Sequence, residues 1–541
     1  MIPYRLITAV ALGGSYLLSS GRIPQWPVPS FLAAFTALLA IQVLAWVVWV
    51  VILYPKLFSP LRGLPEPSGN SWFMGQFKTV MALPTGAPMI QWINSIPNQG
   101  LIRYLGPFNQ ERLFITSPKA LAEVLVTKNY DFIKPEQLRF TIGRILGVGV
   151  LLAEGDEHKV QRKNLLPAFA FRHIKELYPV FWAKSREGVQ AMTEEIIKDA
   201  AQRNDSEKNT AVIEVGNWAS RITLDIIGVA GLGRDFEAIK GPSNRLTQAY
   251  GRIFQPSRQA RILQLLGMLL SPRIVSWLPV KHNEDIDVSV RMIRAECAEL
   301  IKEKKQKLAR KELNDVDILS LMTFLAAGHE TTASAMTWAT YLLAKHPDVQ
   351  TRLRAEVREH LPPLSGAGAD DASTVSSVDI DRMPYLNAVC NEILRYFGPV
   401  PLTLRKAACD TSIQGQFVPK GTQIMLVPWA TNRSEAMWGD DALVFNPERW
   451  MQKSDTDKRA ASGGATSNYA FMTFLHGPRS CIGMSFAKAE FACLLASWVG
   501  RFEMELHNKE EMDEAKVIIK GGVTARPAKG MYIKTTVLEE W

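Results

Sequence analysis

The sequence predicts a mainly α-helical protein with a small β region, preceded by a membrane-spanning helix near the N-terminus. Helical patterns dominate from about residue 117 to residue 400, with apolar side chains recurring at helical spacing. Strand-like runs are short and lie in 101–116 and 411–427. The run 31–54 is apolar except for one threonine and one glutamine. These three observations define the predicted architecture.

The apolar run 31–54 is long enough to cross a bilayer, because a spanning helix needs about 20 apolar residues. Trp46 and Trp49 lie toward its end, where interfacial aromatic residues are common. Lys56 and Arg62 follow the run. The excess of cations on the cytosolic side of membrane proteins therefore predicts that the rest of the chain lies in the cytosol.

A shorter apolar stretch, 6–18, precedes this anchor and contains the pair Gly13 and Gly14. If the stretch spans the membrane, the two segments form a hairpin and the N-terminus is cytosolic. If it does not, the N-terminus is luminal. We favour the single span, with residues 1–30 as a membrane-associated segment.

Four prolines in 55–69 predict a stiff linker with little helix or strand. No internal repeat follows, and 70–541 is predicted to be one large domain. The predicted organisation is therefore a short N-terminal segment, a membrane anchor at 31–54, a proline-rich hinge and a single large domain.

Composition restricts the classes of function. Hydrophobic residues make up 47% of the 541 residues, enough for a sizeable core, and the net charge is +9. No zinc-finger or helix-turn-helix pattern accompanies that charge, so nucleic acid is disfavoured and an anionic membrane or acidic partner is favoured. The five cysteines are scattered without a C-x-x-C pair, which indicates a reducing compartment.

The segment 474–483 places Cys481 in a loop with Gly477 and Gly483, just ahead of an apolar helical stretch. Free N–H groups at the start of a helix create a positive field that favours thiolate over thiol. A thiolate is the proximal ligand that a haem iron needs for O–O cleavage. The glycines let the backbone pass close to a flat macrocycle. Arg479 is positioned to reach a haem propionate.

This pattern, F-x-x-G-x-R-x-C-x-G beginning at Phe474, resembles the haem-binding signature of the cytochrome P450 family at every defined position. The resemblance implies haem b as the cofactor and Cys481 as the axial ligand of its iron. A buried structural cysteine is the alternative, and the length of the matched pattern argues against it.

A second motif resembles the oxygen-activating helix of that family and lies within the predicted helix 315–346. Its matching positions are Ala327, Gly328, Glu330, Thr331 and Thr332. Glycine and threonine are poor helix formers, so the helix can open locally where dioxygen binds. The Thr331 hydroxyl can hold a water by hydrogen bonding, and Glu330 can relay protons as a general acid.

Two neighbours of this motif carry separate predictions. His329 is expected to face away from the cofactor, because one helix face cannot present three consecutive side chains to a flat ring. The alanine at 327 replaces the glutamate that esterifies haem in the fatty-acid ω-hydroxylase branch of the family. Covalent attachment of haem is therefore not expected.

A supporting shell is also predicted. Glu392 and Arg395 are three residues apart and share one helix face. The resemblance implies that they pair with Arg449 and lock the fold behind the haem, a structural and not a catalytic role. It also implies that Arg405 binds a propionate.

The predicted helix beginning near residue 155 resembles the W-x-x-x-R helix of the family, with His158 in place of the tryptophan and Arg162 as the arginine. Imidazole can still donate a hydrogen bond to a propionate, with a strength that depends on protonation. An exposed basic helix face is the alternative. Cations around this helix are expected to dock an acidic reductase, and they are Lys159, Arg162, Lys163, Arg172 and Lys175.

Taken together, the motifs occur in the family order and imply the P450 fold, a triangular helical prism. The implied reaction is a monooxygenation in which electrons from NADPH arrive through NADPH–cytochrome P450 reductase, with cytochrome b5 as a further donor. The implied location is the endoplasmic reticulum membrane, with the domain facing the cytosol. The N-terminal anchor and the motif within the predicted helix 315–346 resemble those of filamentous-fungal P450s that oxidise lipophilic intermediates of secondary metabolism.

Three other functions are compatible with parts of this pattern. A P450-fold isomerase or dehydratase would rearrange a peroxide without a reductase, and the Glu330–Thr331 pair argues against it. A fatty-acid or xenobiotic hydroxylase would share every motif above. A non-catalytic haem-binding or scaffold protein would have no use for the acid–threonine pair.

Overall fold

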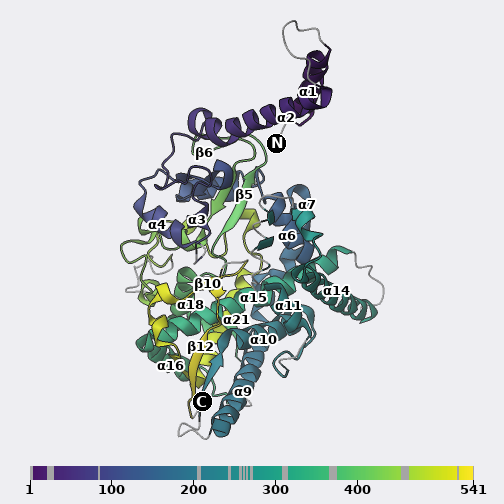
Figure 1. The fold of residues 1–541 in the computed structure, drawn as a ribbon. Coiled ribbons are helices and arrows are strands. Elements are labelled where there is room, and N and C mark those ends of the chain that lie inside the picture. Colours follow the sequence, from purple (N-terminus) through teal and green to yellow (C-terminus); the bar gives the residue numbers. More distant parts are fainter. Residues whose placement is uncertain are drawn as a thin grey trace.

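A computed structural model describes most of the chain. The described residues are 4–20, 30–82, 84, 86–203, 209–241, 245–254, 259, 262–263, 266–267, 272–307, 315–364, 375–451, 462–520, 523–539 and 541. Helices surround a small sheet region, and two N-terminal helices project from this body (Figure 1).

The largest sheet has the strand order β1-β2-β8-β5-β3, with β2 and β8 parallel and the other pairs antiparallel. Its strands are β1 (Leu101–Leu105), β2 (Glu111–Ile115), β3 (Phe132–Ile133), β5 (Thr403–Ala407) and β8 (Gln423–Leu426). The strand-like runs at 101–116 and 411–427 are thereby confirmed. Both runs carry alternating or continuous apolar residues, which are buried against the elements beside the sheet.

The remaining strands form smaller sheets. A three-stranded sheet has the order β4-β12-β9, and two pairs join β6 to β7 and β10 to β11. Their bounds are β4 (Thr210–Glu214), β6 (Thr411–Ile413), β7 (Gln416–Val418), β9 (Phe502–Leu506), β10 (Ile519–Lys520), β11 (Arg526–Pro527) and β12 (Tyr532–Val537).

Helices make up most of the described domain. They are α3 (Phe77–Val80), α4 (Ala87–Ser95), α5 (Pro118–Ala122), α6 (Glu136–Leu146), α7 (Gly155–Leu165), α8 (Phe171–Lys175), α9 (Tyr178–Arg203), α10 (Val215–Ile226), α11 (Arg245–Phe254), α13 (Pro272–Ser276), α14 (Lys281–Lys307), α15 (Asp315–Lys345), α16 (Pro347–His360), α17 (Ser377–Asp381), α18 (Pro384–Tyr396), α19 (Pro428–Thr431), α20 (Glu435–Trp438) and α21 (Met484–Arg501). Short 3-10 and π-helical turns include η3 (Glu123–Thr127), η4 (Leu166–Phe169), η5 (Ile227–Leu232) and η10 (Gly477–Arg479).

Helix α15 runs through the centre of the helical region and packs against α10, α14, α18 and α21. It ends at Lys345, one residue before the predicted end, because Pro347 begins the next helix and cannot continue α15. From Met322 to Leu343 its side chains are almost all buried, and the few accessible ones lie on one face. This helix and α21, which follows the Cys481 loop, form the framework of the candidate site.

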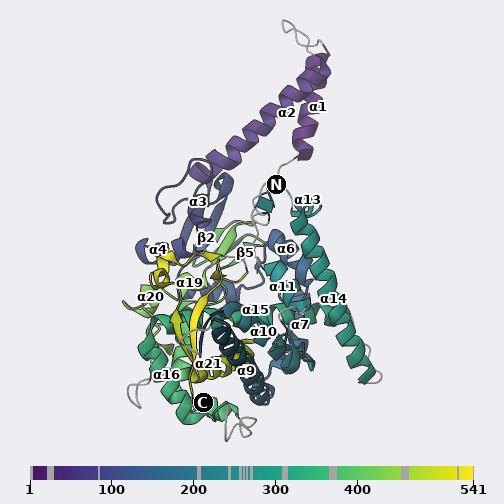
Figure 2. The ribbon, with the colours of Figure 1, turned by 60° about the horizontal axis from the view of Figure 1, so that its bottom comes forward.

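The N-terminal helices α1 (Tyr4–Ser19) and α2 (Phe31–Val48) lie side by side, away from the body of the molecule (Figures 1 and 2). The helix that begins as α2 continues as η1 (Trp49–Phe58), a wider π-helical stretch that includes Pro55. Residues 55–58 are therefore helical, and the predicted linker begins four residues later than expected. A π-helical turn accommodates the proline because the ring removes an N–H from the regular ladder.

The linker is bonded to the domain and does not act as a free spacer. The Arg103 guanidinium donates to the Pro55 carbonyl at 2.6 Å, and the Arg103 N–H donates to the Pro65 carbonyl at 2.9 Å. The Asn109 amide donates to the Val51 carbonyl at 2.9 Å. Hydrogen bonds from the β1–β2 hairpin therefore fix the end of the anchor helix to the domain.

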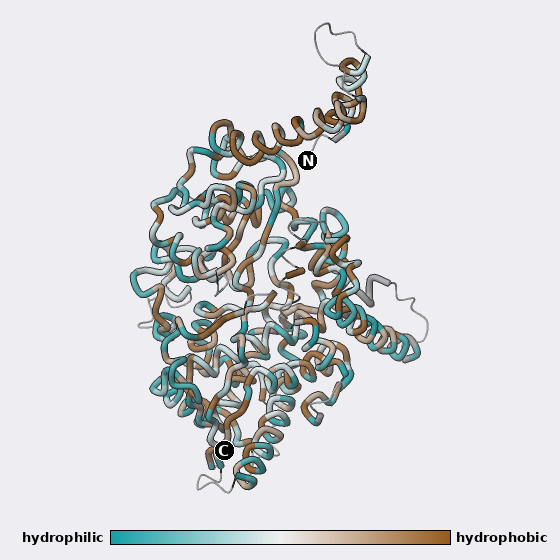
Figure 3. Tube along the Cα trace, in the orientation of Figure 1, coloured by the Kyte–Doolittle hydropathy of each residue, from teal (hydrophilic) through white to brown (hydrophobic). Residues whose placement is uncertain are grey.

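Hydropathy follows the architecture. Apolar residues gather inside the helical region and along the projecting N-terminal helices (Figure 3). One buried cluster joins the helices to each other, and a second lies around the five-stranded sheet. The described part of the molecule thus has two buried apolar clusters and a separate apolar projection.

Candidate functional site

The Cys481 loop is shaped by hydrogen bonds and by one obligatory glycine. The Cys481 N–H donates to the Phe474 carbonyl at 2.9 Å, which closes the loop ahead of α21. Gly477 has φ +74°, and a Cβ there would lie 2.2 Å from the Leu125 carbonyl oxygen. Gly483 has φ −92°, with its nearest neighbour, on Phe169, at 3.6 Å from an ideal Cβ. Of these two loop glycines, backbone geometry requires only Gly477.

The Cys481 side chain is accessible, although the surrounding fold is dense. Burial raises the pKa of its thiol, while the Gly483 N–H and the positive charge of Arg162 act to lower it. The sulfur is therefore accessible to a small molecule, although protein surrounds most of it. The Gly483 N–H and the Arg162 charge would also stabilise a thiolate that binds iron as its proximal ligand.

The accessible face of α15 carries four positions, Phe324, Ala327, Gly328 and Thr331, and the residues between them are buried. These positions recur at the three- and four-residue spacing of one helix face. The Thr331 hydroxyl donates to the Ala327 carbonyl at 2.7 Å, so it competes for the helical backbone as predicted. Gly328 lies close to Ile227, which an ideal Cβ would approach to 3.0 Å.

Phe169 connects this face to the Cys481 loop. Its ring centroid lies 5.3 Å from that of Phe324, and a Cβ built on Gly483 would lie 3.6 Å from the same ring. The accessible stripe of α15 and the cysteine loop therefore border the same region of the molecule.

Glu330 is buried and points away from the accessible face. Its carboxylate pairs with the Arg526 guanidinium at 3.0 Å and accepts a hydrogen bond from the Thr524 hydroxyl at 3.2 Å. Arg526 is a quarter exposed, so this pair lies between solvent and α15. Arg526 also donates to the Glu330 carbonyl at 3.0 Å. The acid is thus held by β11 and the residues before it.

His329 faces the opposite side of α15. Its ring packs 4.6 Å from that of Tyr250, and Nδ1 bonds with the Leu325 carbonyl. Burial lowers the pKa of His329. The prediction that this histidine faces away from the cofactor is consistent with its position.

Thr332 differs from the position expected of a catalytic group. It is buried, and its hydroxyl lies 2.8 Å from the Glu490 carboxyl on α21 and 3.2 Å from the Gly328 carbonyl. Burial raises the pKa of Glu490 well above its usual value. Thr332 therefore connects two helices, and the accessible face of α15 carries Thr331 alone of the threonine pair.

A cluster of cations lies beside the Cys481 loop. We call it the cation cluster, and its members are Lys134, His158, Arg162, Arg405 and Arg479. They come from separate elements: Lys134 follows β3, His158 and Arg162 lie on α7, Arg405 on β5 and Arg479 on η10. All but Arg162 are buried.

One carboxylate accompanies the cluster. Glu154 pairs with Arg479 and accepts the Lys134 backbone N–H at 2.9 Å. Among the described residues it is the one carboxylate whose charge reaches Lys134 and Arg405. Lys134, Arg162, Arg405 and Arg479 thus form a set of four basic side chains near this single acid.

The imbalance affects the protonation of the cluster. Burial and then the Arg405 and Arg479 charges lower the pKa of Lys134 well below its usual value. Burial is the main cause that lowers the pKa of Arg405 to about 10. The Arg479 charge lowers this pKa further, and the Glu154 charge raises it. The cluster is electrostatically costly as it stands, and anions placed within it would stabilise it.

His158 is neutral in this environment. Burial is the main cause that lowers its pKa to about 4, and the neighbouring cations Arg479 and Lys134 add to it. Its Nδ1 lies 3.2 Å from the Tyr130 hydroxyl. When that hydroxyl donates to Nδ1, the proton of the neutral ring is on Nε2, which is then a donor.

Arg162 is partly buried and bonds to the residue that precedes the cysteine. It donates to the Ser480 carbonyl at 2.8 Å and to the Ser480 hydroxyl at 3.2 Å. Arg162 is also a member of the surface patch predicted for a reductase. The other cations of that patch include Lys159 and Arg172, whose side chains are 55% and 89% exposed.

These features fit the haem that the sequence motifs imply. An accessible cysteine deep in the fold suits an axial ligand, and the excess of buried cations suits the two propionates. The Nε of Arg479 is buried without a hydrogen-bond partner, as expected of a group that awaits an acceptor. Cys481 would hold the iron, and His158, Arg405, Arg479 and Lys134 would hold the propionates.

Behind the loop, Glu392 forms the centre of a buried network. The Arg395 guanidinium donates to both its oxygens, at 2.7 and 2.8 Å, and Arg449 donates at 3.2 Å. Trp450 Nε1 and the Asn446 N–H add bonds at 2.9 and 2.8 Å. Neither the Glu392 nor the Arg395 side chain has exposed surface. The network joins α18 to the segment before the Cys481 loop.

Sequence reasoning missed four residues of the site: Lys134, Glu154, Glu490 and Arg526. Each lies far in sequence from its partners, and none belongs to a motif quoted above. Glu490 offered one signal, an acid in the middle of the apolar helix that follows Cys481. An acid at such a position must be buried and neutral or paired.

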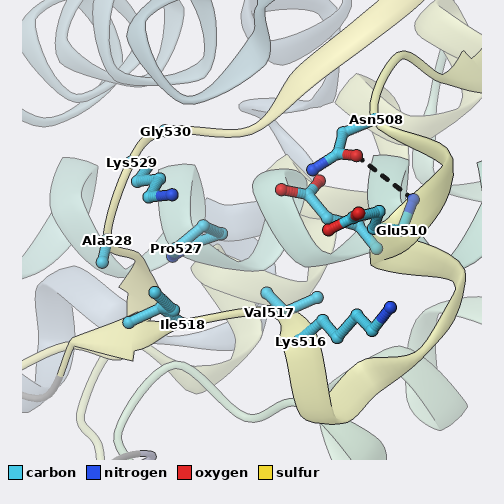
Figure 4. Close-up of a pocket in the computed structure, with 10 residues that line it drawn as sticks. Asn508, Glu510, Lys516, Val517, Ile518, Pro527, Ala528, Lys529 and Gly530 are labelled. Carbon is cyan, nitrogen blue, oxygen red and sulfur yellow. Dashed lines mark hydrogen bonds between the residues drawn. The ribbon is translucent and has the colours of Figure 1, made fainter.

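A small cavity of about 90 Å³ lies elsewhere, between η11 (Lys509–Met512), η12 (Glu514–Lys516) and the β10–β11 region (Figure 4). Lys516 and Lys529 lie on opposite sides of it, and Asn508 accepts the Glu510 N–H at 3.1 Å. None of the predicted site residues lines this cavity. It is not the reaction site.

Comparison with known proteins identifies relatives over nearly the whole chain. The family model described as cytochrome P450 matches residues 67–533. Cytochrome P450 monooxygenase sphH of Aspergillus fumigatus is 45% identical over 533 residues, which cover 95% of each chain. Cytochrome P450 monooxygenase FUM15 of Gibberella moniliformis is 43% identical, covering 90% of each. Cytochrome P450 monooxygenase ALT8 of Alternaria alternata is 42% identical, covering 92% of this chain and 93% of its own.

Proposed function

The chain belongs to the cytochrome P450 family, and from that premise we propose that it is a membrane-anchored haem-thiolate monooxygenase of a lipophilic small molecule. The observation that carries the proposal is the joint placement of the accessible Cys481 thiol and the under-neutralised cation cluster. When bound, haem would supply reductive activation of dioxygen.

Cys481 is proposed as the iron ligand. The Gly483 N–H and the Arg162 charge both favour its thiolate, and the hydrogen bond from the Cys481 N–H to Phe474 fixes its loop. Gly477 allows the loop to pass beside Leu125. Each of these features holds the sulfur in one place before any cofactor binds.

The cation cluster is proposed to hold the propionates. Arg405 and Arg479 would donate charge-assisted hydrogen bonds, which are the strongest available to a carboxylate. His158, neutral at physiological pH, would act as a hydrogen-bond donor and not as a charge. Lys134 would regain its charge when the propionates compensate the arginines.

Proton delivery is proposed to use Thr331 and Glu330 in different ways. Thr331 is the hydroxyl on the accessible face, and it can turn from the Ala327 carbonyl to hold a water. Glu330 stands on the solvent side of α15, paired with the partly exposed Arg526. It would take protons from solvent and pass them through water toward Thr331. Thr332 is assigned a structural role with Glu490.

The monooxygenase reading is favoured over a peroxide isomerase or dehydratase by a specific feature. An isomerase needs no external protons, yet Glu330 is held by both Arg526 and Thr524 near the surface. A catalyst that consumes protons from solvent has a use for that arrangement. Monooxygenase is also the printed activity of the relatives above.

Partners and location are proposed from the same premise. The reductant would be NADPH, delivered through NADPH–cytochrome P450 reductase, with cytochrome b5 as a further donor. The exposed cations of the surface patch, such as Lys159 and Arg172, would attract an acidic partner. The helix Phe31–Phe58 is long and apolar enough to cross a membrane, which supports anchoring in the endoplasmic reticulum with the domain in the cytosol.

The substrate is proposed to be an apolar intermediate of secondary metabolism. Phe324, Ala327 and Ile227 give the region above Cys481 an apolar character, which favours a lipophilic molecule. The fungal sources of the relatives agree with a fungal pathway enzyme. Fatty acids and xenobiotics remain the competing substrate class, and a screen with both classes decides between them.

The deciding experiment is the absorption spectrum of the reduced, carbon-monoxide-bound protein in microsomes. The parent should show the red-shifted Soret band of a thiolate-ligated haem, and Cys481→Ser should lose it while retaining haem. Cys409→Ser is the matched control, because Cys409 is an exposed thiol outside the site. A parent with bound haem and no shifted band would overturn the assignment. NADPH consumption in the presence of reductase then tests the monooxygenase reaction.

A further inference from the structure

The two N-terminal helices pack along a seam of small residues. On α1, Ile7, Ala11 and Ser15 are buried, and on α2 Ala34 is buried. Gly14 lies so close to α2 that an ideal Cβ would meet Leu38 Cδ1 at 2.8 Å. Membrane helices associate through small residues of this kind, because lipid provides no hydrophobic drive and close backbone approach must supply the packing.

The outer faces of both helices are apolar and exposed. On α1 the exposed residues are Leu6, Val10, Leu12, Tyr16 and Leu17, and on α2 they include Leu32, Ile41 and Leu44. The two helices form one continuous apolar projection (Figure 3). Water would make such a surface an aggregation hazard. The hydrocarbon of a bilayer is the one environment that suits both helices together.

Three polar side chains of the pair bond within their own helices. The Ser15 hydroxyl donates to the Ala11 carbonyl, and the Thr36 hydroxyl reaches the Leu32 carbonyl at 3.0 Å. The Gln42 amide donates to the Leu38 carbonyl at 3.3 Å. Inside a bilayer no water can satisfy such groups, so helices that span it must satisfy them internally.

The length of α1 is also compatible with a span. Its 16 residues extend about 24 Å at the rise of an α-helix, close to the roughly 27 Å of hydrocarbon in the endoplasmic reticulum membrane. Its one charged residue is Arg5, at its beginning. Eleven residues, 20–30, join α1 to α2.

We propose that α1 and α2 form a two-span membrane hairpin, with the N-terminus on the same side as the catalytic domain. This rests on the proposed membrane anchoring and replaces the single span favoured from the sequence. The charges agree with it: Arg5 then lies on the same side as Lys56 and Arg62, and the short connection contributes Arg22 alone.

Glycosylation mapping of the full-length chain in microsomes tests the hairpin. One variant carries an Asn-Gly-Thr acceptor in a flexible extension before Met1, and another carries it in a flexible insertion within 20–30. The hairpin predicts glycosylation of the connection and none at the N-terminus, with the untagged chain as baseline. Glycosylation at the N-terminus would overturn the hairpin, and so would an unmodified connection.

Carbonate extraction separates this outcome from failure of the anchor. A chain that resists extraction with a glycosylated N-terminus has one span, so the hairpin is wrong and the anchoring holds. A chain released by carbonate, with neither tag modified, overturns the anchoring as well.

Crosslinking tests the seam itself. In a chain with a protease site inserted in the connection, the pair Gly14→Cys and Leu38→Cys should form a disulfide on oxidation. Cleavage should then leave the N-terminal fragment attached. The control pair Gly13→Cys and Leu38→Cys should release it, because Gly13 has no neighbour within 4 Å. Equal release from both pairs would show that the helices do not pack as described.

Discussion

At the scale of single residues, a neutral Glu490 explains contacts that a carboxylate cannot. Thr332 has one hydroxyl proton but two acceptors nearby, the Gly328 carbonyl and Glu490. If Glu490 is protonated, it donates to the threonine oxygen, which donates onward to Gly328. Burial raises the pKa of Glu490, in agreement with this pattern.

We expect Glu490→Gln to be at least as stable as the parent at neutral pH, because the amide keeps a donor and carries no charge. Since the folded-state pKa of Glu490 is raised, its contribution to stability is present below the usual pKa and is lost as pH rises. The advantage of Glu490→Gln should therefore be larger at pH 7 than at pH 4.5, the usual pKa of the carboxyl. Denaturant unfolding at both pH values measures it.

The control for that variant is Glu490→Ala, which leaves Thr332 without its partner and should cost about 1–3 kcal/mol. A Gln variant that is less stable than the Ala variant would show that the carboxyl is ionised in the folded protein.

Arg526 is expected to position Glu330. Arg526→Gln removes the cation from a buried carboxylate, whereas Arg526→Lys retains a charge within reach. The Gln variant should release more hydrogen peroxide per NADPH oxidised than the Lys variant, because Glu330 loses its fixed position for proton transfer. Peroxide yield against NADPH consumption, measured with reductase present, checks this. Equal yields from the two variants would contradict the role.

At the scale of elements, the conformation of the Cys481 loop depends more on Gly477 than on Gly483. The sequence motif treats Gly477 and Gly483 alike, but their backbones differ. Gly477 is left-handed and faces the Leu125 carbonyl of η3, while Gly483 has an ordinary φ. A neighbouring element, and not the loop sequence, creates this difference.

Gly477→Ala should therefore lose haem loading and stability, with about 1–2 kcal/mol from the left-handed backbone alone before the collision with Leu125 is counted. Gly483→Ala should retain most of both, since its Cβ has ordinary contacts. Haem content per folded protein and thermal unfolding are the measurements. Similar losses in both variants would show that contact with the cofactor, and not the geometry of the protein, requires glycine at these two positions.

At the scale of the whole molecule, tertiary structure gathers the cation cluster from four separate parts of the chain. Its members face one another, with Tyr130, Lys159 and Glu154 as further polar neighbours. Such an assembly makes the haem-free chain sensitive to pH.

In the haem-free chain, His158 should make the free energy of unfolding fall as pH decreases from about 6.5 to about 4. The pKa of His158 is lowered in the folded state. Between these two pH values the unfolded state therefore binds a proton that the folded state does not. His158→Gln should reduce the slope. In the haem-loaded protein, the propionate charges should also reduce the slope of the free energy of unfolding against pH. Unfolding curves of the parent with and without haem, and of His158→Gln without haem, test the two expectations. Identical slopes in all three proteins would contradict the assignment.

The sequence by itself determined the large features of this protein. Apolar periodicity and length predicted α15 and the anchor, because both depend on local composition. The loop around Cys481 and the Glu392–Arg395 pair were predicted from spacing, since i and i+3 positions meet on any helix. The cysteine motif also indicated the family and its chemistry.

Tertiary structure alone decided which side chains meet. Lys134 and Glu154 join the cluster, Thr332 turns to Glu490 and Arg526 holds Glu330, all through contacts between residues far apart in the chain. The packing of α1 on α2, on which the proposed hairpin rests, is likewise a contact between separate elements. The physical reason is that burial and charge depend on three-dimensional neighbours, whereas helix and strand formation depend largely on residues close in sequence.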